Sequence, residues 1–465
     1  MSRIFLLAWL LIWLSACAEV EAPSMVHDDT RATAFVDVNV VPMDSERVLE
    51  GQTVIVRDGR IEALGASSEI DVPAGAEHIE GSGRYLMPGL AEMHGHLPSP
   101  NMPPEVTEDV LFLYVANGVT TVRGMQGDPS QLELRERIEA GELIGPMLVL
   151  GSPSMAGDRV ETVEDARRLV KEYEEAGFDM IKVHEGLSAD VYAAIADTAR
   201  ELNIPFGGHV TDHVGLFEAL EAGQTTIDHL DNFIESLVPE ERMPEEPPGL
   251  RGVGRILDLV DESRMDRVVQ ATRDADGSVV PTMVLWESGI FATRPSAELL
   301  EERNEVRYVP PEMVARWVEA VDESQANANP ETQRGIAELR RRILLALHRG
   351  GVRILLGTDS PQIFSVPGFS IHRELALYVE VGLTPYEVLR SGTRVVGEYL
   401  GRDIGSVEVD KRADLILLEA NPLEDVANVA KRVGVMVAGR FLPEQEIQER
   451  LAAIASRYAT AGGTE

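Results

Sequence analysis

The stretch Met87-Pro88-Gly89-Leu90-Ala91-Glu92-Met93-His94-Gly95-His96 is an apolar run that ends in two histidines. We interpret the run as a buried strand. Because side chains alternate along a strand, His94 and His96 then point to the same side. Imidazole is the commonest nitrogen ligand for zinc, so the pair predicts a metal site. Two solvated loop histidines remain an alternative that the pair by itself leaves open.

Further along the chain, short apolar strands alternate with amphipathic helices. This alternation is typical of parallel strands joined by helical crossovers. Eight such units predict a (β/α)8 TIM barrel of the α/β class, with its active site at the C-terminal ends of the strands. The eight strand candidates are Met87–Met93, Thr120–Val122, Met147–Leu150, Met180–Val183, Phe206–His209, Thr225–His229, Val279–Leu285 and Val352–Leu356.

Runs rich in β-branched residues flank this region on both sides. The N-terminal runs are Ala34–Val41, Thr53–Arg57 and Arg60–Leu64, and Asp58-Gly59 between the last two predicts a hairpin turn. Comparable runs return at Ala413–Leu418 and Val433–Arg440. Two β-rich ends therefore flank the helical and parallel-stranded middle.

Composition indicates a large soluble protein. Hydrophobic residues make up 44% and charged residues 26% of the 465 residues, close to globular averages. Acidic residues outnumber basic ones by 78 to 42, which gives a formal net charge of -36. Because such a charge repels phosphates, we expect no nucleic-acid partner.

The N-terminus has the features of an export signal. Arg3 precedes the apolar run Ile4–Leu14, which is shorter than a membrane-spanning helix, and small residues follow it. Leu14-Ser15-Ala16-Cys17 resembles the lipobox of bacterial lipoproteins, which implies cleavage before Cys17 and a lipid on its sulfur. Ala18 after that cysteine implies the outer membrane, facing the periplasm. The sole cysteine of the chain, Cys17, leaves no intramolecular disulfide.

The motifs taken together resemble those of the amidohydrolase superfamily, in its prolidase- and imidazolonepropionase-like branch. Besides residues 87–96, the resemblance rests on Ile181-Lys182-Val183-His184, Gly208-His209-Val210, Ile227-Asp228-His229 and Gly357-Thr358-Asp359-Ser360. These motifs fall in order on predicted strands four, five, six and eight. The match covers nearly everything after Thr33.

The resemblance also implies how the chain is divided. In that family the two flanks combine into one small composite β-sandwich domain beside the barrel. The expected segments are a lipoprotein signal peptide (1–16), a flexible tether (17–33), the N-terminal portion of the β-sandwich (34–84), the metal-dependent barrel (85–399), the C-terminal portion of the β-sandwich (400–445) and a C-terminal helix and tail (446–465).

Further metal ligands are expected at other strand ends. His209 and His229 each end a short apolar strand, so both can point over the barrel mouth with His94 and His96. Lys182 lies among apolar neighbours, where an unpaired ammonium is costly to bury. The resemblance implies that Lys182 is carboxylated and that its carbamate bridges two divalent metal ions, with zinc expected. A lysine paired with Glu185 or Asp179 is the alternative.

Asp359 follows the last apolar strand. By resemblance it is both a metal ligand and the general base that later returns the proton to the leaving amine. The family mechanism implied is attack of a metal-bridging hydroxide on the substrate carbonyl. The sequence has no Gly-x-Ser-x-Gly elbow, Walker loop or Gly-x-Gly-x-x-Gly fingerprint.

Two residues are candidates for substrate binding. Arg123, at the end of strand two, is a candidate clamp for a substrate carboxylate. His184 lies just past strand four, where a substrate contact and a solvated loop are both open, and the same holds for His213 past strand five. The remaining histidines are interpreted as structural: His27, His78, His348 and His372.

These features predict a hydrolase that cleaves an amide or peptide bond in a dipeptide or N-acyl amino acid. A mononuclear deaminase, an imidazolonepropionase-like cyclic-amide hydrolase and a non-catalytic lipoprotein binding module are the alternatives. Two long insertions, Asp231–Ser263 and Glu287–Thr332, are expected to shape the substrate pocket, and a purely structural elaboration is the alternative. We expect membrane contact only through the lipid anchor, and a homo-oligomer is left open.

Overall fold

The computed structural model describes residues 32–461, apart from residues 247, 250–251 and 293. The predicted signal peptide, Cys17, His27 and nearly all of the tether lie outside the described residues, so they stay predictions. Within the described ranges, no helix is both long and apolar enough to cross a membrane.

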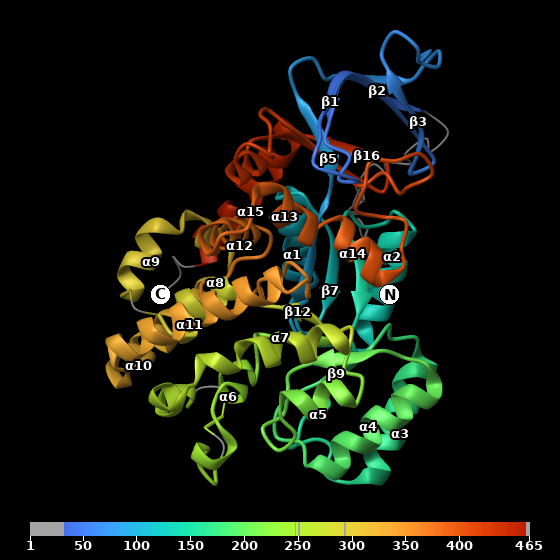
Figure 1. The fold of residues 1–465 in the computed structure, drawn as a ribbon. Helices are drawn as coiled ribbons and strands as arrows, with labels where there is room; N and C mark the ends of the chain where they lie inside the picture. Colours follow the sequence, from blue (N-terminus) through green and yellow to red (C-terminus); the bar gives the residue numbers. More distant parts are fainter. Residues whose placement is uncertain (1–31, 247, 250–251, 293, 462–465) are drawn as a thin grey trace, which may run out of the picture.

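The body of the molecule is a barrel of eight parallel strands, which confirms the predicted fold (Figure 1). The strands form two sheets, in the orders β13-β12-β11-β10-β9 and β6-β7-β8. Parallel bridges from Gly151 to Met180 and from Gly95 to Ser360 join the two sheets at both seams. The barrel strands are β6 (Leu90–Gly95), β7 (Val119–Gly124), β8 (Met147–Leu150), β9 (Ile181–Val183), β10 (Phe206–Gly208), β11 (Thr226–Asp228), β12 (Ser278–Val280) and β13 (Arg353–Ile354).

A helix follows each barrel strand and covers its outer side. Local sequence defines the ends of these helices: Thr162 accepts a hydrogen bond from the Asp165 amide before the third of them, and Gly177 ends it with a φ of 92°. The eight helices are α1 (Pro104–Ala116), α2 (Ser130–Glu139), α3 (Val163–Ala176), α4 (Ala189–Leu202), α5 (Leu216–Glu221), α7 (Met265–Asp274), α11 (Pro330–Arg349) and α12 (Phe369–Val381). Two shorter helices, α13 (Pro385–Ser391) and α14 (Arg394–Leu400), complete this layer.

The two β-rich flanks combine into one sheet above the barrel in Figure 1. Its strand order is β16-β15-β14-β5-β1-β2-β3, and β4 pairs with β1, so C-terminal strands continue an N-terminal sheet. The strands are β1 (Thr33–Val40), β2 (Leu49–Arg57), β3 (Arg60–Ala66), β4 (Glu77–Glu80), β5 (Tyr85–Pro88), β14 (Leu415–Leu418), β15 (Arg432–Val437) and β16 (Arg440–Pro443); η6 (Val426–Ala430) separates β14 from β15. The expected composite domain is therefore present as one eight-stranded sheet.

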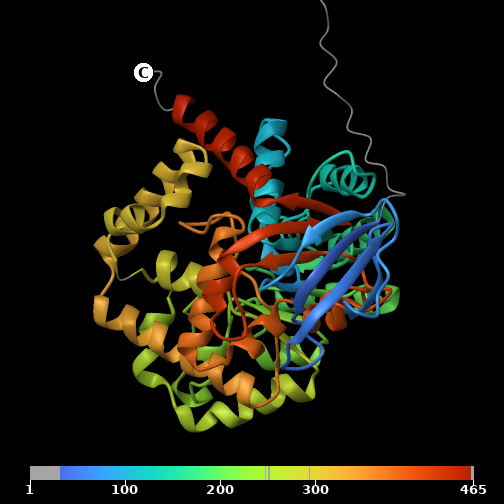
Figure 2. The same ribbon diagram turned by 90° about the horizontal axis from the view of Figure 1, so that it is seen from above.

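The last helix, α15 (Glu444–Ala461), returns from this sheet to the barrel. Its red ribbon lies beside that of α1 in Figure 2. The Tyr458 hydroxyl of α15 donates to the Asp109 carboxylate of α1 at 2.9 Å. The C-terminal helix therefore covers an outer part of the barrel.

The first predicted strand is divided in two. Met87 and Pro88 belong to β5 of the flanking sheet, whereas β6 of the barrel begins at Leu90. Gly89 stands between them, and a Cβ there would lie 2.0 Å from Thr120 Oγ1. One apolar run thus connects the two domains through a position where the Thr120 side chain leaves no room for a side chain larger than that of glycine.

The seventh predicted strand, Val279–Leu285, is shorter than expected. β12 ends at Val280, and the short helix α8 (Met283–Leu285) follows. Pro281 has no amide to donate to the strand ladder. The buried Glu374 carboxylate accepts the Met283 and Val284 amides at 2.8 and 2.7 Å, which stabilises the helical turn.

Both long insertions have secondary structure of their own. The first contains α6 (Phe233–Ser236), η1 (Glu240–Arg242), η2 (Val253–Leu259) and η3 (Glu262–Arg264). The second contains η4 (Trp286–Ile290), α9 (Ser296–Glu302), η5 (Asn304–Tyr308) and α10 (Pro311–Asn327). They lie on the lower and left sides of the barrel in Figure 1.

Candidate metal centre

Two histidines and an aspartate meet at the C-terminal end of the barrel. His94 lies at the end of β6, His96 follows it, and Asp359 follows β13. His96 Nε2 is 2.6 Å from Asp359 Oδ1, and His94 Nε2 is 3.8 Å from the same oxygen. One ligand atom from each of the three lies within 4.8 Å of the others, so the group can hold a metal ion.

His209 and His229 extend this group from the opposite wall. The His229 ring centroid is 4.4 Å from that of His94 and 4.5 Å from that of His209. His229 Nε2 also lies 3.8 Å from Asp359 Oδ2. His229 and Asp359 have φ values of 62° and 60°. Residues other than glycine rarely adopt this conformation, and those that do are concentrated at functional sites.

Each of the four histidines is bonded through Nδ1 to a neighbouring side chain. Such contacts fix the orientation and tautomer of a ligand histidine and leave Nε2 for a metal. The partners are Asp228 for His94 at 2.7 Å, Gln126 for His96 at 3.2 Å, Asp231 for His209 at 2.7 Å and Thr282 for His229 at 2.8 Å. The arrangement therefore presents four oriented imidazoles to one space.

Sequence reasoning missed these four partners. Asp228 stands inside the quoted Ile227-Asp228-His229 motif, and Asp231 lies two residues after His229. A search for carboxylates next to strand-end histidines could have found both. Gln126 and Thr282 carry no comparable signal, because each is an ordinary loop residue in the sequence.

Burial keeps three of the ligand imidazoles, those of His94, His209 and His229, neutral. It lowers the pKa of His209 to about 3 and depresses the pKa values of His94 and His229 well below the usual range, with Lys182 contributing at each. A neutral imidazole is the form that ligates a metal. The electrostatics of the site therefore suit metal binding.

Lys182 lies in β9 at the base of this group. Its side chain is 1% exposed, and Nζ has no hydrogen-bond partner. Burial lowers the pKa of its amine. The alternative of a pair with Asp179 or Glu185 is wrong, since Nζ bonds to neither and Asp179 is engaged by Arg135 at 2.9 Å.

These observations test whether the residues fit divalent metal ions. Nζ of Lys182 and Nε2 of His229 are both buried polar atoms without a hydrogen-bond partner. Leaving such atoms unsatisfied costs free energy, and a metal ion or a carboxylated amine would satisfy them. The donor set of imidazoles and a carboxylate is also the one that zinc prefers. The residues fit.

Arg123 does not have the predicted role. It is 0% exposed, and its guanidinium donates to Asp228 at 3.0 and 3.2 Å, to Thr226 Oγ1 at 3.1 Å and to the Met93 carbonyl at 2.6 Å. A side chain so engaged cannot clamp a substrate. The prediction was wrong because strand β7 directs Arg123 into the barrel interior, where it supports the Asp228–His94 pair.

The other histidines divide between the site and the scaffold. The His184 ring lies 4.4 Å from that of His209, so it borders the metal centre, and burial lowers its pKa to about 3. His213 is exposed, and His348 pairs with Glu387 at 3.2 Å. His372 is a largely buried residue of α12, and His78 is exposed on β4.

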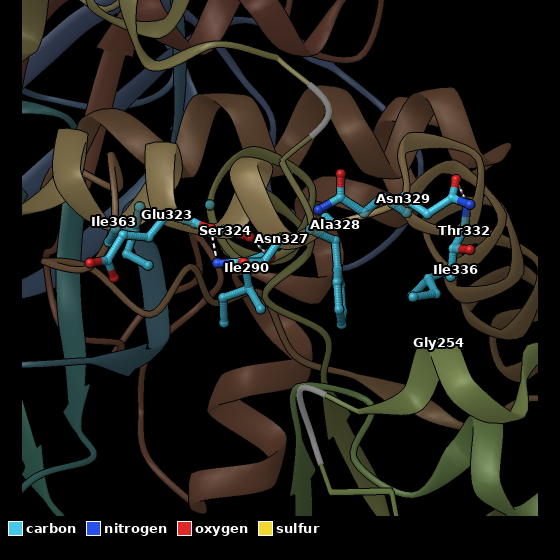
Figure 3. Close-up of a pocket in the computed structure, with 14 residues that line it drawn as sticks. Gly254, Ile290, Glu323, Ser324, Asn327, Ala328, Asn329, Thr332, Ile336 and Ile363 are labelled. Carbon is cyan, nitrogen blue, oxygen red and sulfur yellow. Dashed lines mark hydrogen bonds between the residues drawn. The ribbon is translucent and has the colours of Figure 1, made fainter.

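Two cavities lie near the C-terminal ends of the barrel strands. One, of about 220 Å³, is bordered by His96 and Gln126. The other, of about 450 Å³, is bordered by residues of both insertions and by Ile363, which follows Asp359. Figure 3 shows Ser324 and Asn327 of α10, Thr332 of α11 and Gly254 of η2 around it. Both insertions thus line a cavity, as expected for loops that shape a pocket.

Known proteins similar to this chain share its fold. The family model described as the amidohydrolase family matches residues 85–442. The structure of a bottromycin amidohydrolase is 25% identical with a TM-score of 0.70, over 93% of this chain and 91% of that chain. A Bifidobacterium longum protein described as a prolidase is 24% identical with a TM-score of 0.66, over 92% and 99% of the two chains.

A curated relative matches only locally. A dihydroorotase from Trichlorobacter lovleyi is 39% identical over 72 residues, which are 15% of this chain and 16% of the dihydroorotase. The match therefore spans about a sixth of that relative.

Proposed function

Because the chain belongs to the amidohydrolase family, and is thus a metal-dependent hydrolase acting on carbon–nitrogen bonds, we propose that it cleaves the amide bond of a dipeptide or an N-acyl amino acid. The observation that carries this proposal is the convergence of three oriented imidazoles on the Asp359 carboxylate, with the fourth, His209, against His229. The neighbour described as a prolidase supports the choice of substrate class.

The ligand set has a clear division of labour. His94, His96, His209, His229 and Asp359 would hold the divalent ions, and Lys182, once carboxylated, would be a further ligand. Bound ions would polarise the amide carbonyl and increase the acidity of a water molecule. Zinc is the ion we propose, from the nitrogen-rich donor set.

Asp359 moves the proton. Its carboxylate accepts a proton from the attacking water as the new carbon–oxygen bond forms, and it donates that proton to the nitrogen as the carbon–nitrogen bond breaks. Oδ1 and Oδ2 lie beside different histidines, at 2.6 Å from His96 Nε2 and 3.8 Å from His229 Nε2, so the carboxylate is held between the two walls of the site. No covalent acyl-enzyme is required.

The proposal is tested with the zinc-loaded full chain and a panel of dipeptides, N-acyl amino acids, lactams and cyclic ureas. We expect turnover of the first two classes and two equivalents of metal per chain by elemental mass spectrometry. Asp359→Asn should reduce kcat by about 10²- to 10⁴-fold, the usual contribution of a general acid–base group. Lys182→Ala should lower the metal content, whereas Lys171→Ala, at an exposed lysine of α3, should not.

Other results would replace the proposal. One equivalent of metal that persists in Lys182→Ala would favour a mononuclear deaminase or a cyclic-amide hydrolase. Binding of amides without turnover would make the protein a binding module.

A further inference from the structure

We propose that the cavity beside His96 receives the apolar part of an amide substrate that carries a carboxylate, and that Arg316 binds this carboxylate. The inference rests on the proposed amide hydrolysis and narrows its substrate class. It assigns to Arg316 of α10 the specificity role that Arg123 cannot have.

The position of the cavity links it to the metal centre. His96 and its Nδ1 partner Gln126 both line it. Pro361 and Gln362, which line it as well, follow Asp359 by two and three residues. A substrate with its amide at the metal centre can therefore place an adjoining group in this cavity.

The walls of the cavity are mainly apolar. Val106, Val110 and Leu113 of α1 face it from one side, and Val309 and Met313 face it from the second insertion. All of these except Met313 are at most 9% exposed, so the walls are part of the packed structure. Burial of an aliphatic or aromatic group there would remove apolar surface from water and so favour binding.

The charge of the cavity selects an anion. Arg316 lines it and is exposed, and among the described residues no carboxylate pairs with its guanidinium. No lining residue is acidic, although the chain has 78 acidic residues, so nothing in the lining competes for the cation. Guanidinium groups bind carboxylates through two parallel hydrogen bonds. The occupant that fits is a dipeptide or N-acyl amino acid with an apolar C-terminal residue.

The test compares acid and carboxamide forms of one substrate, such as N-acetyl-leucine and its amide, with the zinc-loaded protein. We expect wild type to prefer the acid, and Arg316→Ala to lower kcat/KM for the acid about ten- to a hundredfold more than for the carboxamide, through KM. Arg334→Ala removes an exposed arginine of α11 outside the cavity. It should change the ratio of kcat/KM for the acid to kcat/KM for the carboxamide less than twofold. Unchanged thermal unfolding and metal content establish that each variant is folded.

A second variant tests the walls. Met313→Trp reduces the cavity volume, so it should lower kcat/KM for N-acetyl-leucine more than for N-acetyl-glycine. Equal use of acid and carboxamide by wild type, or an Arg316→Ala ratio equal to that of wild type, overturns the inference while amide hydrolysis stands. If no amide is hydrolysed, the proposed function fails, and calorimetric binding of N-acetyl-leucine decides the inference alone: weakening by Arg316→Ala supports it, and unaltered or absent binding overturns it.

Discussion

At the scale of single residues, the metal centre depends on pairs of side chains. Each ligand histidine is oriented by a neighbour at its Nδ1 atom. His94 is held by a chain of two hydrogen bonds, since its partner Asp228 accepts in turn from Arg123. All three of these side chains are at most 1% exposed. The guanidinium therefore acts on the site only through the carboxylate that orients the histidine.

Replacement of Arg123 tests this supporting role. Arg123→Met leaves the Asp228 carboxylate buried without its counter-ion, so we expect the free energy of unfolding to fall by about 3–5 kcal/mol. Urea unfolding measures the loss. Activity toward acid and carboxamide substrates should fall in equal proportion, because Arg123 does not reach the substrate. A loss of activity toward acid substrates alone, with unchanged stability, would support the hypothesis that Arg123 binds a substrate carboxylate.

At the scale of elements, one glycine separates two domains that share an apolar run. Gly89 donates its amide to the Asp414 carbonyl of the flanking sheet at 2.8 Å, and Leu90 donates to the Gly118 carbonyl of the barrel at 2.9 Å. The chain thus changes sheets within two residues. This change places His94 at the end of a barrel strand and leaves Met87 in the flanking sheet.

A methyl group at position 89 should disturb this crossing. Gly89→Ala places a Cβ 2.0 Å from Thr120 Oγ1, so it forces a shift that we expect to cost about 1–3 kcal/mol of folding stability. Thermal and urea unfolding measure it. The second substitution Thr120→Ala should recover part of the loss, because it removes the nearest atom. An unchanged midpoint for Gly89→Ala would show that the contact relaxes without cost.

At the scale of the whole molecule, the barrel and the flanking sheet are also connected on the C-terminal side. His372 lies in α12 of the barrel and is electrostatically coupled to Arg373 and to Arg432 of β15, which pairs with Glu444 at 3.3 Å. Neither ring nitrogen of His372 has a hydrogen-bond partner. Burial first, and then the two arginines, lowers the pKa of His372 to about 3.

This histidine should make the junction sensitive to acid. Its folded pKa lies below the ordinary 6.5, so the unfolded chain binds the proton more tightly, and stability falls as pH decreases from 6.5 toward 3. Between pH 8 and pH 5, the free energy of unfolding should decrease for both proteins, but by on the order of 2 kcal/mol less for His372→Gln than for wild type. Urea unfolding at the two pH values measures the difference. His78→Gln, at an exposed histidine, should behave as wild type; a His372→Gln curve parallel to wild type would refute the idea.

The sequence by itself determined the alternation of strands and helices and the position of His94, His96, His209, His229 and Asp359 at strand ends. Those features depend on residues close together in the chain, where periodicity is visible. Only the tertiary structure decided which residues face each other across the barrel. Asp228 lies 134 positions from His94 and Thr282 lies 53 from His229, so their pairing follows from barrel closure. The same closure turned Arg123 inward and brought Arg316, from a long insertion, to the cavity beside His96, because a side chain's direction within a closed barrel depends on strand register and packing.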